Sequence, residues 1–191
     1  MSMKNKQIVN EKSSQKVAKF LDKNNLHKKD FAQMIGVTLS YVYNLIDNNI
    51  PFSSRSTTLE RIATVMDIMP EEFIEYQIPQ DVPIYSENLE FLKDTIKQNK
   101  LTTVDFLKLF ERKKRLNLVD VLRGAKPLPI DFSELKNIAD ILKMSDEELF
   151  ELWRARMSEF LQEGGFNLDK NKKLIQSMFE GAKRYLKSNK A

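Results

Sequence analysis

The spacing of apolar residues restricts most strongly how this chain can fold. Apolar side chains recur every three or four positions in one segment after another, whereas alternating runs of β-branched residues, which mark strands, are nearly absent. This spacing places one apolar stripe along each helix. Hydrophobic residues make up 41% of the chain, which is enough to build a core beneath such stripes. The pattern therefore predicts an all-α protein.

The first third of the chain predicts five short helices followed by a linker. The first three span residues 15–24, 28–35 and 39–46, and a polar loop follows at 47–55. Thr57 and Glu60 predict a capping box that opens a fourth helix. Pro70 suits the first position of a fifth helix at 71–76. Residues 77–86 contain two prolines and no helical period, so they predict a linker.

The helical pattern then returns in the second half of the chain. Matching positions are mostly apolar or acidic: Phe31 with Phe106 at an offset of 75, then Pro51 with Pro127, Leu59 with Leu135 and Glu72 with Glu148 at 76. A chance likeness between two amphipathic stretches is the alternative. The run of matches favours a structural repeat. We expect a domain at 1–76, a linker at 77–86 and a second five-helix domain at 87–163.

The C-terminal part predicts two longer helices. Ser145 and Glu148 form a capping box, and the helix that they open is expected to run through Trp153 to Gln162, where two glycines stop it. A last helix, at about 169–187 within a C-terminal extension of 164–191, is apolar on one side and basic on the other. Its apolar side is expected to pack on its own chain or to form a dimer seam.

Residues 31–45 carry the main functional signal. Gly36 permits the positive φ of a sharp turn, and Thr38 suits the cap of the helix that follows. Val42 and Leu45 would anchor that helix in the core. The positions left outside are Leu39, Ser40, Tyr43 and Asn44. A helix held in this way can enter the major groove of DNA and reach base edges with its first turns.

With these residues, the segment 16–76 resembles the Cro/phage-repressor-like (XRE) helix-turn-helix proteins. Residues 35–42 look like the turn of that family, and the order of five helices is similar. The chain departs from the family at Lys28 and Leu39, because glutamine often begins both helices of the motif. These departures leave the fold unaffected, but they mean that the base sequence recognised does not follow from the resemblance.

The resemblance implies two classes of DNA contact. Base contacts would come from Thr38, Leu39, Ser40, Tyr43 and Asn44. Phosphate contacts would come from Lys28, Asn48, Asn49 and Arg55. A carboxamide such as that of Asn44 can pair with adenine through two hydrogen bonds, whereas phosphate contacts position the protein without selecting sequence. Ordinary surface or turn roles remain open for Tyr43, Asn48, Asn49 and Arg55.

The second unit differs from the first at the turn. In place of the Gly36 turn it has Glu111 followed by four cations, Arg112, Lys113, Lys114 and Arg115. One interpretation is a second basic site that grips phosphates or the minor groove. The other is a solvated, degenerate copy retained for packing or dimerisation. Four adjacent cations repel one another unless something anionic lies near, which slightly favours contact with nucleic acid.

Composition narrows the possible functions. The net charge of +4 is compatible with nucleic acid. The absence of cysteine excludes disulfides and thiolate sites, and a single histidine, His27, leaves no cluster with metal-ligand spacing. We therefore expect no metal, no cofactor and no enzymatic activity. No apolar run approaches the ~20 residues of a membrane helix, and a cytoplasmic protein is expected.

Together these observations predict a sequence-specific DNA-binding transcriptional regulator. We expect a repressor that binds double-stranded DNA through the major groove as a homodimer, joined through residues beyond about 85. Two alternatives stay open, because fold does not fix function. One is a protein-interaction module that binds its partner through the second domain. The other is an architectural DNA-binding protein with little sequence preference.

Overall fold

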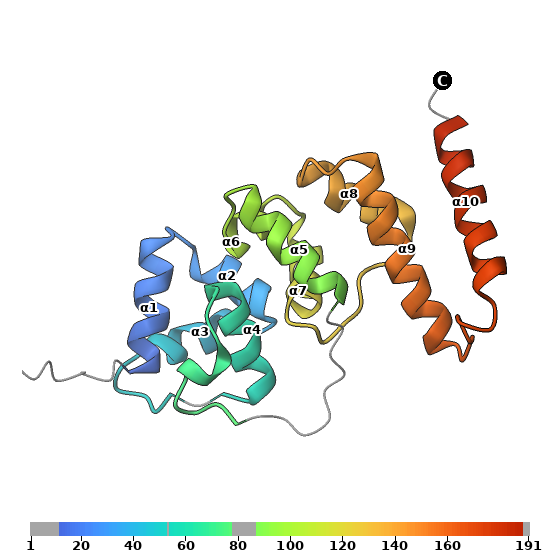
Figure 1. The fold of residues 1–191 in the computed structure, drawn as a ribbon. Helices are drawn as coiled ribbons and strands as arrows, with labels where there is room; N and C mark the ends of the chain where they lie inside the picture. Colours follow the sequence, from blue (N-terminus) through green and yellow to red (C-terminus); the bar gives the residue numbers. More distant parts are fainter. Residues whose placement is uncertain (1–11, 53, 78–86, 189–191) are drawn as a thin grey trace, which may run out of the picture. The chain divides into compact units, whose positions relative to one another are not determined.

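The computed structural model describes residues 12–52, 54–77 and 87–188 (Figure 1). Within these residues it contains ten α-helices, one short 3-10 helix and no strand, which confirms the all-α prediction. The chain forms two compact units. Unit 1 combines Met1–Val82 with Leu101–Arg123, and unit 2 combines Pro83–Lys100 with Gly124–Ala191. Each unit is therefore assembled from two separate stretches of sequence.

The first stretch of unit 1 contains four α-helices and a 3-10 helix. They are α1 (Ser13–Lys23), α2 (Lys28–Ile35), α3 (Leu39–Ile46), α4 (Ser56–Met66) and η1 (Pro70–Glu72). The bounds of α2 and α3 are those that the sequence predicted. The side chains that fill the core between these helices are Val17, Leu21, Phe31, Ile35, Val42, Leu45, Leu59, Ile62 and Phe73. Burial of these apolar surfaces is the main force that holds the helices together.

Two local predictions in this stretch are wrong. The fourth helix does not open with a capping box at Thr57 and Glu60, because it begins at Ser56 and its N-cap, Arg55, makes no side-chain capping bond. The Glu60 side chain instead accepts a hydrogen bond from the Tyr76 hydroxyl at 3.0 Å and pairs with Arg123. The fifth helix is only the short turn η1, because the backbone becomes extended at the buried Phe73.

The second stretch of unit 1 adds α6 (Thr103–Lys108) and α7 (Arg112–Leu122). Helix α7 packs against α2 and α4, and α6 packs against α4. The structure therefore groups residues 87–163 differently from the expected second domain, since α6 and α7 complete the unit that contains α1–α4. The sequence did not indicate that α2 and α4 would cover α7.

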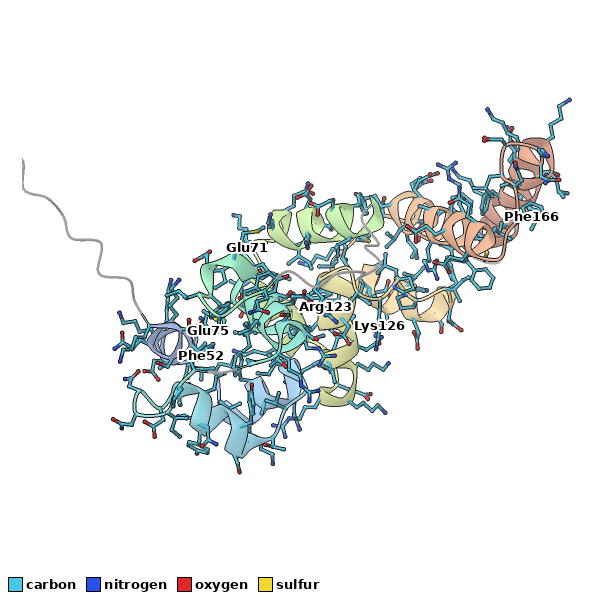
Figure 2. All side chains as sticks on the ribbon, turned by 90° about the horizontal axis from the view of Figure 1, so that it is seen from below. Phe52, Glu71, Glu75, Arg123, Lys126 and Phe166 are labelled. Carbon is cyan, nitrogen blue, oxygen red and sulfur yellow. The ribbon has the colours of Figure 1, made fainter. Side chains whose placement is uncertain are left out.

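A buried polar cluster fastens α7 to α4. Arg61 of α4 donates from Nε and Nη2 to the two carboxylate oxygens of Asp120 at 2.8 and 3.1 Å, and Arg123 Nε donates to Asp120 at 2.9 Å. Arg123 also pairs with Glu60, and Figure 2 shows its side chain beside α4. The Asp120 side chain is 5% exposed. Because every buried charge in this cluster has an opposite charge, the desolvation cost is offset.

Gly36 connects α2 to α3 and also receives α7. It ends α2 in the left-handed conformation, with φ of 72° and ψ of 39°. A Cβ added to Gly36 would lie 2.9 Å from Leu116 Cδ1 of α7. Two physical requirements therefore select glycine here: a positive φ, which costs other residues about 1–2 kcal/mol, and the close approach of Leu116.

Unit 2 contains α5 (Glu87–Gln98), α8 (Phe132–Ile141), α9 (Asp146–Glu163) and α10 (Lys172–Ser188). The capping box of Ser145 and Glu148 opens α9 as predicted, and the helix ends at Gly164. The Trp153 ring lies 6.2, 5.8 and 5.7 Å from the rings of Phe132, Phe150 and Phe179. This aromatic cluster connects α8, α9 and α10.

We predict that Gly36→Ala lowers the free energy of unfolding by more than Gly165→Ala does. Both substitutions place alanine at a positive φ, which costs about 1–2 kcal/mol, but a Cβ at Gly165 meets no atom within 4 Å. The difference between the two variants therefore measures the contacts of the added Cβ with Leu116 Cδ1 and Arg61 Nη1, which would lie 2.9 and 3.1 Å away. Adding Leu116→Ala to Gly36→Ala should recover part of that difference in urea unfolding followed by circular dichroism. Equal losses in the two single variants would contradict the close packing.

We also predict that Asp120 stabilises the protein in a pH-dependent manner. Burial alone raises the pKa of Asp120, but hydrogen bonds from Arg61 and Arg123 outweigh it, so the pKa lies below its usual value. A lowered pKa in the folded state gives stability that is present above the unfolded-state pKa of about 3.9 and is lost as the pH falls through the folded-state pKa.

Asp120→Asn should therefore cost about 3 kcal/mol at pH 7, because it leaves two arginines without their shared carboxylate. The difference in the free energy of unfolding between the variant and the wild type should disappear at acid pH, where Asp120 is protonated. Asp140→Asn, at an exposed position of α8, is the matched control and should change stability little. A gap that stays constant from neutral to acid pH would show that the Asp120 charge contributes nothing.

Candidate nucleic-acid interface

The turn between α2 and α3 fixes the position of α3. The N–H of Tyr41 donates to the side-chain oxygen of Thr38 at 3.2 Å, so Thr38 caps α3 as the sequence predicted. Val42 is fully buried and Leu45 is 4% exposed, so both anchor α3 in the core of unit 1. The Tyr41 hydroxyl donates to Ser54 at 2.8 Å and holds the following loop against α3. Nothing in the sequence indicates this last contact.

The outer face of α3 consists of Leu39, Ser40, Tyr43 and Asn44, and all four residues are exposed. Leu39 is 39% exposed and Tyr43 is 55% exposed, which are high values for large apolar side chains. Helix α3 packs on α1 and α2 with its opposite side. The outward orientation that the sequence predicted is therefore present in unit 1, and the four side chains are available to a partner.

The structure places the predicted phosphate contacts in different settings. Lys28 begins α2, and its ammonium lies 5.6 Å from the centre of the Tyr43 ring, at the edge of the outer face of α3. Arg55 is exposed at the start of α4. The Asn48 carboxamide oxygen accepts a hydrogen bond from Ser14 at 2.8 Å, and the Asn49 backbone N–H and side-chain amide donate to Asp47 at 2.9 and 3.0 Å. Both asparagines therefore have structural contacts of their own.

The four adjacent cations that follow Glu111 occupy the first turns of α7, within unit 1. Arg112 Nε and Arg115 Nη1 lie 3.2 and 3.7 Å from the same carboxylate oxygen of Asp30 in α2, as ion pairs without hydrogen-bond geometry. Arg115 is nearly buried and donates to the carbonyl oxygens of Phe110 and Lys108 at 3.1 and 3.3 Å. Arg115 therefore has a structural role and is not part of an exposed basic site.

The remaining cations of α7 are exposed. Lys113 pairs with Glu111 at 3.0 Å, and its side chain is 78% exposed. A hydrogen bond from Lys113, together with its charge, lowers the pKa of the Glu111 carboxyl. Lys114 is exposed as well. Protein carboxylates at Asp30 and Glu111 thus relieve part of the repulsion among the cations, and the sequence did not indicate the Asp30 contacts because 82 positions separate it from Arg112.

In the described part of the chain, no group of three or more histidine, cysteine, aspartate or glutamate side chains could hold a metal ion. Among the same residues, no helix is both long and apolar enough to cross a membrane.

Comparison with known proteins identifies the region around α3. Residues 16–79 match the family model of the Cro/C1-type HTH DNA-binding domain. The match covers most of α1, all of α2, α3 and α4, and η1. No curated protein and no solved structure matches the chain significantly. The geometry of the Gly36 turn agrees with this match, and residues 16–79 of this chain are similar to the Cro/C1-type HTH DNA-binding domain.

Proposed function

We propose that this protein is a sequence-specific transcriptional regulator that inserts α3 into the major groove of double-stranded DNA. The Cro/C1-type domain makes it a DNA-binding regulator at the family level. The observation that carries the finer proposal is the exposed outer face of α3, set opposite the buried Val42 and Leu45. A helix supported on one side and exposed on the other suits the major groove, which is about 12 Å wide.

The side chains on the outer face of α3 suit contact with bases. The carboxamide of Asn44 can pair with the N6 and N7 atoms of adenine, and Leu39 can contact a thymine methyl group. Lys28 lies at the edge of this face, beside Tyr43, where a phosphate of the flanking backbone would pass. Thr38 has a capping role that leaves its exposed methyl group available for an apolar contact.

We further propose that the protein acts as a repressor in the cytoplasm by occluding a promoter as a homodimer. Two-fold symmetry would double the phosphate contacts and match a palindromic site. Exposed apolar side chains on unit 2 support a seam beyond residue 85, since Phe160, Leu174 and Met178 are 48%, 55% and 54% exposed. The same side chains suit a different protein partner, which is the alternative function.

Selection of bound sequences from a random pool of duplex DNA tests this proposal. The expected result is an enriched motif with two half-sites whose centres lie about 34–36 Å apart, or a multiple of that distance, because each α3 of a dimer enters its own groove. Binding without any enriched motif would indicate an architectural DNA-binding protein. Absence of binding at low salt would overturn the proposal and favour a protein-interaction module.

We predict different consequences for substitution of Asn44 and of Lys28. Asn44→Ala should cost about 1–3 kcal/mol at one base pair of the selected site and relax specificity there. Lys28→Ala should weaken binding to all sequences alike and reduce the slope of log K against log salt by about 0.9. Asn137→Ala, at an exposed position of α8, is the control and should change neither quantity. A uniform loss across sequences for Asn44→Ala would exclude a base contact.

A further inference from the structure

The helices of the second half follow those of the first at the offsets found in the sequence. Helix α6 begins 75 residues after α2, α7 ends 76 residues after α3, and α8 begins 76 residues after α4. The non-glycine residues Asn25 and Asp67 have positive φ, and so do their counterparts Lys100 and Lys143. These coincidences support α7 as the counterpart of α3, the helix proposed to contact bases.

This correspondence assigns a counterpart in α7 to each residue on the outer face of α3. The counterparts of Leu39, Ser40, Tyr43 and Asn44 are Arg115, Leu116, Val119 and Asp120. None of them is exposed. Val119 is 0% and Asp120 is 3% exposed. The side of α7 that would face DNA in an active copy of the motif is therefore covered within unit 1.

Helices α2 and α4 provide this cover. Leu116 contacts the Gly36 turn, Arg115 lies beside Asp30 of α2, and Asp120 accepts hydrogen bonds from Arg61 of α4. Arg61 and Asp120 form a bidentate pair, a geometry that holds the two helices in one register. While α7 is docked in this way, it cannot place these residues in a groove of DNA.

Three cations at the start of α7 are exposed, and Arg112 among them pairs with Asp30 of α2. The side chains of Arg112 and Lys113 are 57% and 78% exposed, and Lys114 is exposed. The Lys113–Glu111 pair is at the surface, where such pairs contribute little, whereas the Asp30 side chain is only 17% exposed. Lys113 can therefore exchange its carboxylate partner for a phosphate at small cost.

Helix α2 connects these cations to the outer face of α3, because it contacts both α3 and α7. Asp30, in the first turn of α2, contacts the first turn of α7, whereas Gly36 at the end of α2 contacts Leu116 further along α7. The start and the end of α2 therefore both lie against the first turns of α7. The start of α2 also lies at the outer face of α3, because Lys28 is beside Tyr43. The first turn of α2 thus contacts both the outer face of α3 and the cations of α7.

We propose that α7 has exchanged base contact for docking, and that Arg112, Lys113 and Lys114 bind the phosphate backbone of the DNA that flanks the base pairs contacted by α3. This inference rests on the proposed function of α3. Its partner is the duplex backbone, because a cluster of exposed cations attracts phosphates and selects no sequence. The patch increases affinity and footprint without changing the motif.

The double variant Lys113→Gln/Lys114→Gln tests the inference in the full-length protein. Arg112 is left in place because it pairs with Asp30. Loss of two phosphate contacts should reduce the slope of log K against log salt by about 1.8, equally on the selected site and on random DNA. Hydroxyl-radical footprints should lose protection at the outer edge of the site, while the selected motif stays the same. Circular dichroism checks that the variant is folded.

The control variant Lys136→Gln/Lys172→Gln removes the same charge from exposed positions of unit 2, and its salt slope should equal that of wild type. If the α7 variant keeps the wild-type slope and footprint, the inference is overturned while the proposed function stands. An equal decrease of the salt slope in both variants would show that net charge alone causes the effect, and it would also overturn the inference. If wild-type protein binds no DNA, the proposed function fails and this inference fails with it.

Discussion

The left-handed backbone of Gly36 is the constraint on which the rest of unit 1 depends. It ends α2 and turns the chain so that α3 buries Val42 and Leu45 and leaves its other side exposed. The same absence of a side chain admits Leu116, so that α7 can lie against α2. One residue without a Cβ thus serves both the presentation of α3 and the docking of α7. A change there would disturb two interfaces together.

The polar cluster around Asp120 adds specificity to this packing. Apolar contacts would tolerate small shifts of α7, since the hydrophobic effect has no direction. A carboxylate shared by Arg61 and Arg123 is satisfied in only one arrangement, and the Glu60 and Tyr76 contacts extend the same cluster to the end of the domain matched by the family model. Replacement by apolar residues could preserve stability, but it would leave the position of α7 less well defined.

Features governed by local sequence were predicted well, and features governed by distant contacts were not. The bounds of α2 and α3 and the outward side of α3 follow from helical spacing and the Gly36 turn. The predicted capping role of Glu60 failed because Arg123, 63 positions away, binds its carboxylate. Helical spacing could not show that α2 and α4 cover one side of α7. The pairing of Asp30 with Arg112 was missed for the same reason.

The interleaved connectivity of the two units has a consequence for biosynthesis. The chain leaves unit 1 after Val82, returns at Leu101 and leaves again after Arg123. Synthesis from Val82 to Arg123 takes roughly 2–8 s at about 5–20 residues per second. During that interval the nascent chain has α2 and α4 without the helix that covers them, and their uncovered surface is open to chaperones or to a neighbouring chain. Unit 1 is therefore complete only after α7 has been synthesised.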